Sequence, residues 1–183
     1  SKKIKVIDCT FDIQNSLKDR IEAIREEVET AVREGSTCIV LSDKDFSSQK
    51  ASIPSILTVG AVHSHLVKHG LRGYCSLNVE CSDAMDTHSF AILIGVGATT
   101  VNPYLAIDSI YQRFEKKLFG KSDFETCVSK FKKSIDAGLL KIMSKMGISV
   151  ISSYRGGCNF EAVGLSRAIV SDYFPGMSSR ISG

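Results

Sequence analysis

Polar side chains that could do acid–base or anion-binding chemistry follow the apolar, strand-like segments of this sequence. If those strands run parallel, their carboxyl ends meet at one rim, which is where α/β folds bind ligands. Two interpretations stay open: a ligand-binding rim, and an internal polar network or docking face. The residues concerned are Asp8, Thr10, Asp43, Lys44, Glu80, Asp83, Asn102, Tyr154 and Arg155.

The most distinctive stretch is 143–165, MSKMGISVISSYRGGCNFEAVGL. Residues 148–151 are predicted as a short strand, and Arg155 follows it beside Gly156 and Gly157. A guanidinium group, helped by backbone N–H groups at glycines, can hold a carboxylate or a phosphate. The sequence therefore suggests an anion-binding turn at the end of this strand.

Three histidines offer possible metal ligands. His65 and His69 are four residues apart and can face the same side of one helix, whereas His63 points elsewhere. A zinc site needs three or four ligands, and this helix supplies no glutamate to act as a base. We expect surface or helix-capping histidines here and predict no metal site.

Two short motifs are similar to catalytic signatures without completing them. Gly95 and Gly97 begin a dinucleotide-binding pattern, but its third glycine would fall at Thr100, and the pair ends a predicted helix. Ser166 lies in a sequence similar to a nucleophile elbow that lacks the last glycine and a preceding strand. Helix-ending glycines and a helix N-cap explain these motifs better, so they supply no catalytic residue.

The composition indicates one globular domain. The chain has 183 residues, long enough to bury a core, and 43% of them are hydrophobic, as in ordinary soluble proteins. The net charge of +3 is too small to demand nucleic acid or an anionic membrane, and the lysine-rich segment 116–145 interleaves no aromatic platform on its polar side. No apolar run reaches membrane-spanning length and no signal-peptide pattern is present, so we expect a cytoplasmic protein.

The six cysteines are expected to be buried, reduced thiols. They are scattered among apolar or strand-like segments, and no pair has the two-residue spacing of a zinc or redox site. They are Cys9, Cys38, Cys75, Cys81, Cys127 and Cys158.

Strands and helices that would position these residues alternate along the whole chain. The crossovers are long enough for parallel pairing, which predicts an α/β fold, either a doubly wound sheet or part of a barrel. The apolar strand 37–41 is expected to be covered on both faces. Strands are predicted at 4–9, 37–41, 74–80, 99–102 and 148–151. Helices are predicted at 16–34, 54–69, 88–96, 104–119 and 123–146, the last capped by Ser122, with short helices from Asn159 and Ser166 and an exit linker at 174–183.

Several motifs, in order along almost the whole chain, resemble the central domain of glutamate synthase. They are IPS (53–55), VGAVH (59–63), HSFAILIGVGA (88–98), VNPYLA (101–106), KMGIS (145–149), SYRG (153–156), FEAVGL (160–165), YFPG (173–176) and SRI (179–181). Local departures include Lys44, where the family often has arginine, Ser64 between the usual histidines, and the triplet 157–159 in place of a more apolar one. These departures affect fine contacts and leave the resemblance intact.

The resemblance implies one domain, 1–183, of a much larger enzyme, with an incomplete TIM-barrel-like parallel sheet. In that family a glutaminase domain releases ammonia from glutamine, and an FMN domain combines it with 2-oxoglutarate to give glutamate. Electrons come from NAD(P)H or ferredoxin through FMN and an iron–sulfur cluster, and the central domain itself binds no flavin. The glutaminase nucleophile of the family is an N-terminal cysteine, whereas this chain begins with Ser1, and no cluster-type grouping of cysteines is present.

No catalytic, cofactor-binding or metal-binding residue of the family therefore maps onto this sequence. The first hypothesis is an interdomain role: the chain positions the glutaminase and FMN domains and helps to enclose the ammonia path. In this hypothesis Arg155 belongs to a fixed structural corner that faces neighbouring domains. The alternative is a self-standing barrel-type enzyme whose rim, centred on Arg155, binds a small anionic substrate. A third expectation is that the segment, once excised, self-associates through its unpaired edges.

Overall fold

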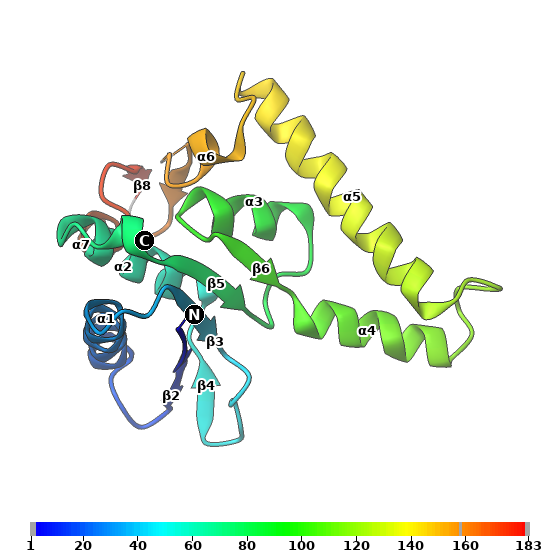
Figure 1. Cartoon of the computed structure of the whole chain (residues 1–183), viewed down its shortest axis with the longest axis horizontal. Coiled ribbons are helices and arrows are strands. Elements are labelled where there is room, and N and C mark those ends of the chain that lie inside the picture. The colour runs from blue at the N-terminus through cyan, green and yellow to red at the C-terminus, as the bar shows by residue number, and fades with distance from the viewer. Residues whose placement is uncertain (1–2, 158, 182–183) are drawn as a thin grey trace.

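A four-stranded parallel sheet forms the centre of the molecule (Figure 1). The computed structural model describes residues 3–157 and 159–181. The sheet has the order β1-β3-β5-β6, and it does not close into a barrel. The prediction of an α/β fold with an incomplete parallel sheet is therefore confirmed. The strands are β1 (Ile4–Asp8), β3 (Cys38–Ser42), β5 (Ser76–Glu80) and β6 (Thr100–Asn102).

Three helices cover one face of this sheet, and the ends of each lie within one residue of a predicted helix. They are α1 (Leu17–Arg33), α2 (Ser55–Lys68) and α3 (Thr87–Gly95). Ser16 caps α1 by accepting a hydrogen bond from the Asp19 N–H, and Asp86 caps α3 in the same way. Ile24 and Val28 of α1 are fully buried, and with them the sheet residues Ile39 and Leu77 form the core.

The opposite face of the sheet is uncovered. Ile4 and Val6 are 62% and 59% exposed, and Val40 in the next strand is half-buried. The expectation that strand 37–41 is covered on both faces is therefore wrong for these residues. Asn78 links strands on this face, because its amide donates to the Ile39 carbonyl at 3.1 Å and its Oδ1 accepts from Thr100 Oγ1 at 2.7 Å.

Two further helices form a hairpin beside α3. α4 (Tyr104–Glu115) ends four residues before its predicted end, and α5 (Phe124–Lys145) packs against both α3 and α4 (Figure 1). Asp123, and not Ser122 as predicted, caps α5, because its carboxylate accepts from the Thr126 N–H at 2.6 Å. No helix in the described part of the chain is long and apolar enough to cross a bilayer.

The chain after α5 departs from the predictions. The strand predicted at 148–151 does not form, because the Ile148 N–H closes the end of α5 on the Met143 carbonyl and α6 (Ile151–Tyr154) begins directly afterwards. The short helix predicted from Asn159 is also wrong, since this segment holds the strand β7 (Glu161–Val163). The helix predicted from Ser166 is confirmed as α7 (Arg167–Tyr173), with Ser166 as its cap.

Smaller elements complete the fold. The region 174–183, expected to be an exit linker, contains β8 (Ser178–Ile181), which pairs in parallel with β7. β2 (Thr10–Asp12) and β4 (Lys50–Ser52) form an antiparallel pair beside the carboxyl end of β1, and η1 (Arg72–Tyr74) precedes β5.

Candidate functional site

The rim at the carboxyl ends of the strands is centred on Glu80. Its carboxylate accepts hydrogen bonds from Ser42 Oγ at 2.8 Å and Asn102 Nδ2 at 3.1 Å, and Lys44 Nζ lies 2.7 Å from Oε1. Burial opposes its ionisation, but the bonds from Lys44 and Ser42 outweigh burial and hold the pKa of Glu80 below its usual value. The predicted convergence of Lys44, Glu80 and Asn102 is therefore confirmed.

The other acidic residues of the rim bind backbone and hydroxyl groups nearby. Asp8 Oδ1 accepts from the N–H and the hydroxyl of Thr10, at 2.9 and 2.7 Å. Asp43 Oδ2 accepts from the N–H of Ser82 at 3.0 Å and from its hydroxyl. Asp83 accepts from an N–H in the first turn of α2 at 3.0 Å. The geometry favours the internal polar network over a ligand-binding rim.

Three polar atoms at or near the rim have no hydrogen-bond partner among the described residues. They belong to Asp43 (Oδ1), Tyr104 (Oη) and Thr58 (Oγ1). Burial and the neighbouring Asp43 carboxylate raise the pKa of Tyr104, so its hydroxyl stays protonated. Asp43 and Thr58 also border a cavity of about 10 Å³, too small for any substrate larger than water. No motif in the sequence points to Tyr104, whose ring also lies 5.2 Å from Lys44 Nζ.

Tyr154 and Arg155 do not join the rim, so their predicted place there is wrong. Tyr154 is fully buried and donates to the Ala91 carbonyl in α3 at 3.1 Å. Arg155 Nε donates at 3.0 Å to the carbonyl of Ala98, which precedes β6 and therefore lies at the amino end of that strand. The strand predicted before Arg155 is absent. Arg155 therefore meets the sheet at the amino ends of its strands and not at the carboxyl ends, where the rim lies.

At that amino end, His63 lies between two guanidinium groups. Arg72 Nε donates to His63 Nδ1 at 3.0 Å, which requires this nitrogen to be unprotonated. Burial, followed by the charges of Arg72 and Arg155, lowers the pKa of His63 to about 4. Gly97, with a φ of +130°, leaves room for the imidazole, since a Cβ there would meet the His63 ring. The glycines at the end of α3 therefore serve packing, and the hydrogen bonds of Arg72 and Arg155 make this region a corner of the fold.

A cavity of about 430 Å³ lies beside this corner, between α2, α3, α7 and the chain that follows α7. Its polar lining includes Arg25, whose guanidinium pairs with Asp172 at 3.2 Å and Glu22 at 2.8 Å. The same guanidinium lies 4.9 Å from the centre of the Tyr173 ring. The charge of Arg25 is thus already matched by carboxylates of the chain.

The histidine pair on α2 meets a glutamate that the sequence analysis missed. His65 Nε2 lies 2.6 Å from Oε2 of Glu29, which belongs to α1, and His69 Nδ1 lies 4.0 Å from the same oxygen. Hydrogen bonds from Arg33, and then from His65, lower the pKa of Glu29, so the carboxylate is ionised. Only the packing of α1 against α2 brings this glutamate to the histidines, so periodicity along one helix could not reveal it.

The described cysteines carry no disulfide, which agrees with the prediction of reduced thiols. Cys9, Cys75, Cys81 and Cys127 are buried, and Cys38 is half-buried. Burial raises the pKa of both Cys9 and Cys81 to about 12, so neither is a ready nucleophile. Cys158 lies outside the described residues.

Fold and rim together define an α/β domain with an open parallel sheet, covered on one face, whose strand-end polar groups largely bind one another. Residues 1–166 match the family model described as "Glutamate synthase central domain". The chain belongs to this family, as its motifs suggest.

Curated relatives extend the match over nearly the whole chain. The sequence is 56% identical over 180 residues to "Glutamate synthase [NADPH] large chain" of Azospirillum brasilense, covering 97% of this chain. It is 42% identical over 185 residues to the protein of the same name from Bacillus subtilis, and 39% identical over 196 residues to the chloroplastic ferredoxin-dependent enzyme of Spinacia oleracea, with 99% of this chain covered in each case. The chain spans 12% of the length of each of these relatives.

Proposed function

We propose that this chain acts as the interdomain segment of a glutamate synthase, which forms two glutamates from glutamine, 2-oxoglutarate and a reductant. In this role it holds the glutaminase and FMN domains in register and helps to enclose the path of ammonia between them. The observation that carries the proposal is the family match over 1–166, together with relatives about eight times as long as the matched segment.

The open face of the sheet supports this role. Parallel sheets are ordinarily covered on both faces, and a row of apolar side chains on an open face favours a partner. Here Ile4 and Val6 are more than half exposed, and Val40 lies directly beside Val6 in the strand register. The proposed cover is another domain of the same parent chain.

In this proposal the chemistry of the parent reaction takes place in other domains of the parent chain. Among the described residues the strand-end groups bind mainly one another, and the cavity beside Asp43 and Glu80, about 10 Å³, is too small for 2-oxoglutarate. FMN and an iron–sulfur cluster belong, in this proposal, to the other domains, and the enzyme is cytoplasmic. No three cysteines converge within the described residues, as an iron–sulfur cluster would need. The segment on its own is then not catalytic, and it self-associates when the open face has no cover.

The first experiment assays the purified chain for turnover of glutamine, and of 2-oxoglutarate with a reductant. The proposal expects neither activity, and either one refutes the proposed division of labour. Light scattering on the same sample checks self-association, because a strict monomer at high concentration contradicts an exposed docking face.

The second experiment places Val6→Arg in the complete parent enzyme and measures glutamate formed per glutamine hydrolysed. Val6 is already exposed, so the stability of the chain should change by less than about 0.5 kcal/mol. We expect the ratio to fall at least about twofold, since a buried arginine weakens docking and lets ammonia escape. Ile4→Arg, on the same face, should behave alike, whereas Lys5→Ala, on the same strand but the other face, should not. An unchanged ratio in both arginine variants contradicts the interdomain role of this face.

A further inference from the structure

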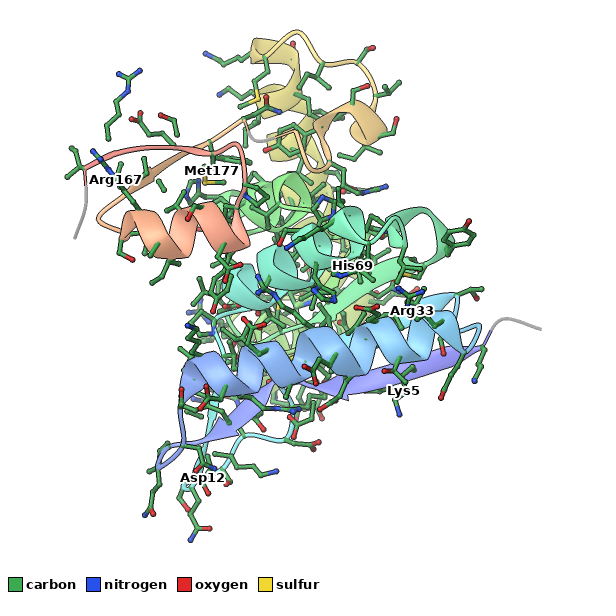
Figure 2. All side chains as sticks on the ribbon, turned by 90° about the vertical axis from the view of Figure 1, so that its left-hand side faces the viewer. Lys5, Asp12, Arg33, His69, Arg167 and Met177 are labelled. Atoms are coloured by element: carbon green, nitrogen blue, oxygen red, sulfur yellow. The ribbon has the colours of Figure 1, made fainter. Side chains whose placement is uncertain are left out.

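Three potential metal ligands converge where α1 packs against α2. A carboxylate oxygen of Glu29 and one ring nitrogen each of His65 and His69 lie within 4.8 Å of one another. Among the described residues this is the one group of three or more potential ligands found so close together. In Figure 2 the two helices run side by side, and the labelled Arg33 and His69 mark the ends at which the group lies.

The carboxylate is oriented toward the two histidines. Arg33 holds Oε1 of Glu29 through Nε and Nη2, both at 2.8 Å, and thereby leaves Oε2 directed at the imidazoles. Oε2 is 2.6 Å from His65 Nε2 and 4.0 Å from His69 Nδ1. Neighbouring ligands of a tetrahedral zinc are about 3.3 Å apart, which is longer than the 2.6 Å between Oε2 and His65 Nε2 and shorter than the 4.8 Å within which the three residues' ligand atoms lie. Small side-chain rotations therefore suffice to surround one cation.

The protonation of the histidines also suits a metal. His69 Nδ1 lies 2.8 Å from the backbone carbonyl of His65, which can only accept, so Nδ1 carries the proton and Nε2 has the lone pair. A second ring nitrogen held by a backbone carbonyl is the usual support of a metal-binding histidine. At His65 the cation replaces the Nε2 proton that now bridges to Glu29, and this proton leaves to solvent.

We propose that Glu29, His65 and His69 bind one divalent transition-metal cation of the zinc class, with water completing the coordination. Two imidazoles and one carboxylate suit zinc and its neighbours, whereas magnesium and calcium prefer oxygen ligands alone. The His69 side chain is 35% exposed and the other two about 20%, so a cation can enter from solvent. Bound there, the cation joins α1 to α2 independently of the proposed interdomain role.

The experiment titrates the purified chain, freed of metal with a chelator, with Zn²⁺ by calorimetry, and repeats the titration with Mg²⁺. We expect one Zn²⁺ per chain in addition to any binding at cysteines, no comparable binding of Mg²⁺, and a higher midpoint of thermal unfolding with Zn²⁺. His69→Ala and Glu29→Gln should each weaken this binding at least about tenfold.

His88→Ala is the matched control, because it removes an exposed histidine at the start of α3, outside the group. It should leave the affinity for Zn²⁺ unchanged, and circular dichroism should show all variants folded. His69 is largely outside the core, so its alanine variant tests the site even if another variant unfolds. Zn²⁺ binding that is unaltered by His69→Ala and Glu29→Gln overturns the proposal, as does the absence of any binding at 100 µM Zn²⁺, roughly the upper limit for a useful three-ligand site.

Discussion

Gly60 on α2 and Phe174 after α7 should be energetically coupled. Gly60 is buried, and a Cβ placed on it would overlap the Phe174 ring, with Cδ1 at 2.6 Å, and would lie 3.0 Å from the Tyr173 carbonyl oxygen. Phe174 is 5% exposed and so belongs to the core, although it begins the segment expected from sequence to be a linker. The pair therefore reports whether this segment is docked on α2.

The structure gives both the sign and the size of the coupling. In a helix interior Gly→Ala gains about 1 kcal/mol in propensity, but overpacking against a buried ring costs about 1–3 kcal/mol. Gly60→Ala should thus destabilise the protein by about 1 kcal/mol, and Phe174→Ala by about 3–5 kcal/mol. In the Phe174→Ala background the ring is gone, so Gly60→Ala should become neutral or slightly stabilising. The close contact of the new Cβ with the Tyr173 carbonyl oxygen offsets part of the gain in helix propensity. The coupling is then about 1–2 kcal/mol.

Urea unfolding of the four chains, followed by far-ultraviolet circular dichroism, measures this coupling. Gly73→Ala serves as the control, because no atom lies within 4 Å of a Cβ at that position. The reasoning is refuted if the two effects simply add, or if Phe174→Ala costs little. Either result means that Phe174 does not rest on α2 in solution.

Three further predictions use the same assay. The pKa of His63 is about 4 in the folded chain and about 6.5 when unfolded, so the unfolded state binds more protons between these pH values. The free energy of unfolding should therefore fall by up to about 2 kcal/mol as the pH drops from 6.5 toward 4. His63→Gln should flatten this pH dependence, and an unchanged slope in the variant contradicts the prediction. Thr58→Val removes a buried hydroxyl that has no partner among the described residues and should stabilise by about 1 kcal/mol, so a loss of stability would show a partner in solution. Asp123→Ala should lower the unfolding midpoint more than Ser122→Ala does, because Asp123 caps α5. If Ser122→Ala has the larger effect, Ser122 is the cap, as expected from the sequence.

Long, capped elements could be predicted from the sequence, and short apolar ones could not. α1 combines a cap at Ser16 with a buried stripe through Ile24 and Val28, signals that agree with each other over many turns. The run 148–151 is only four residues long, and its apolar side chains fit a strand, a helix cap or a loop equally well. In the structure the Ile148 N–H bonds to the Met143 carbonyl at the end of α5, so these residues do not form a strand. Arg155 therefore does not lie at the end of a strand, as the sequence predicted.

The candidate sites divide in the same way. Lys44, Glu80 and Asn102 could be predicted to meet, because each sits at the end of a parallel strand and the strand order is simple. The pairing of Glu29 with His65 depends on the rotation of two packed helices, which no spacing within either helix encodes. The sequence also did not reveal that only one face of the sheet is covered. Val40 lies half-exposed on the open face, but its side chain is as apolar as those of the buried strand residues, so the two faces look alike in the sequence.

The amide of Asn78 bears on the order in which the sheet folds and its open face is covered. It ties β5 to β3 and β6 by hydrogen bonds on the uncovered face, where no packing holds the strands. A sheet shifted by one residue would turn this side chain toward the core, where its amide has no such partners. The strand register is thus set by the domain itself, without help from anything on the open face. The sheet can therefore complete its own folding before anything packs on its open face.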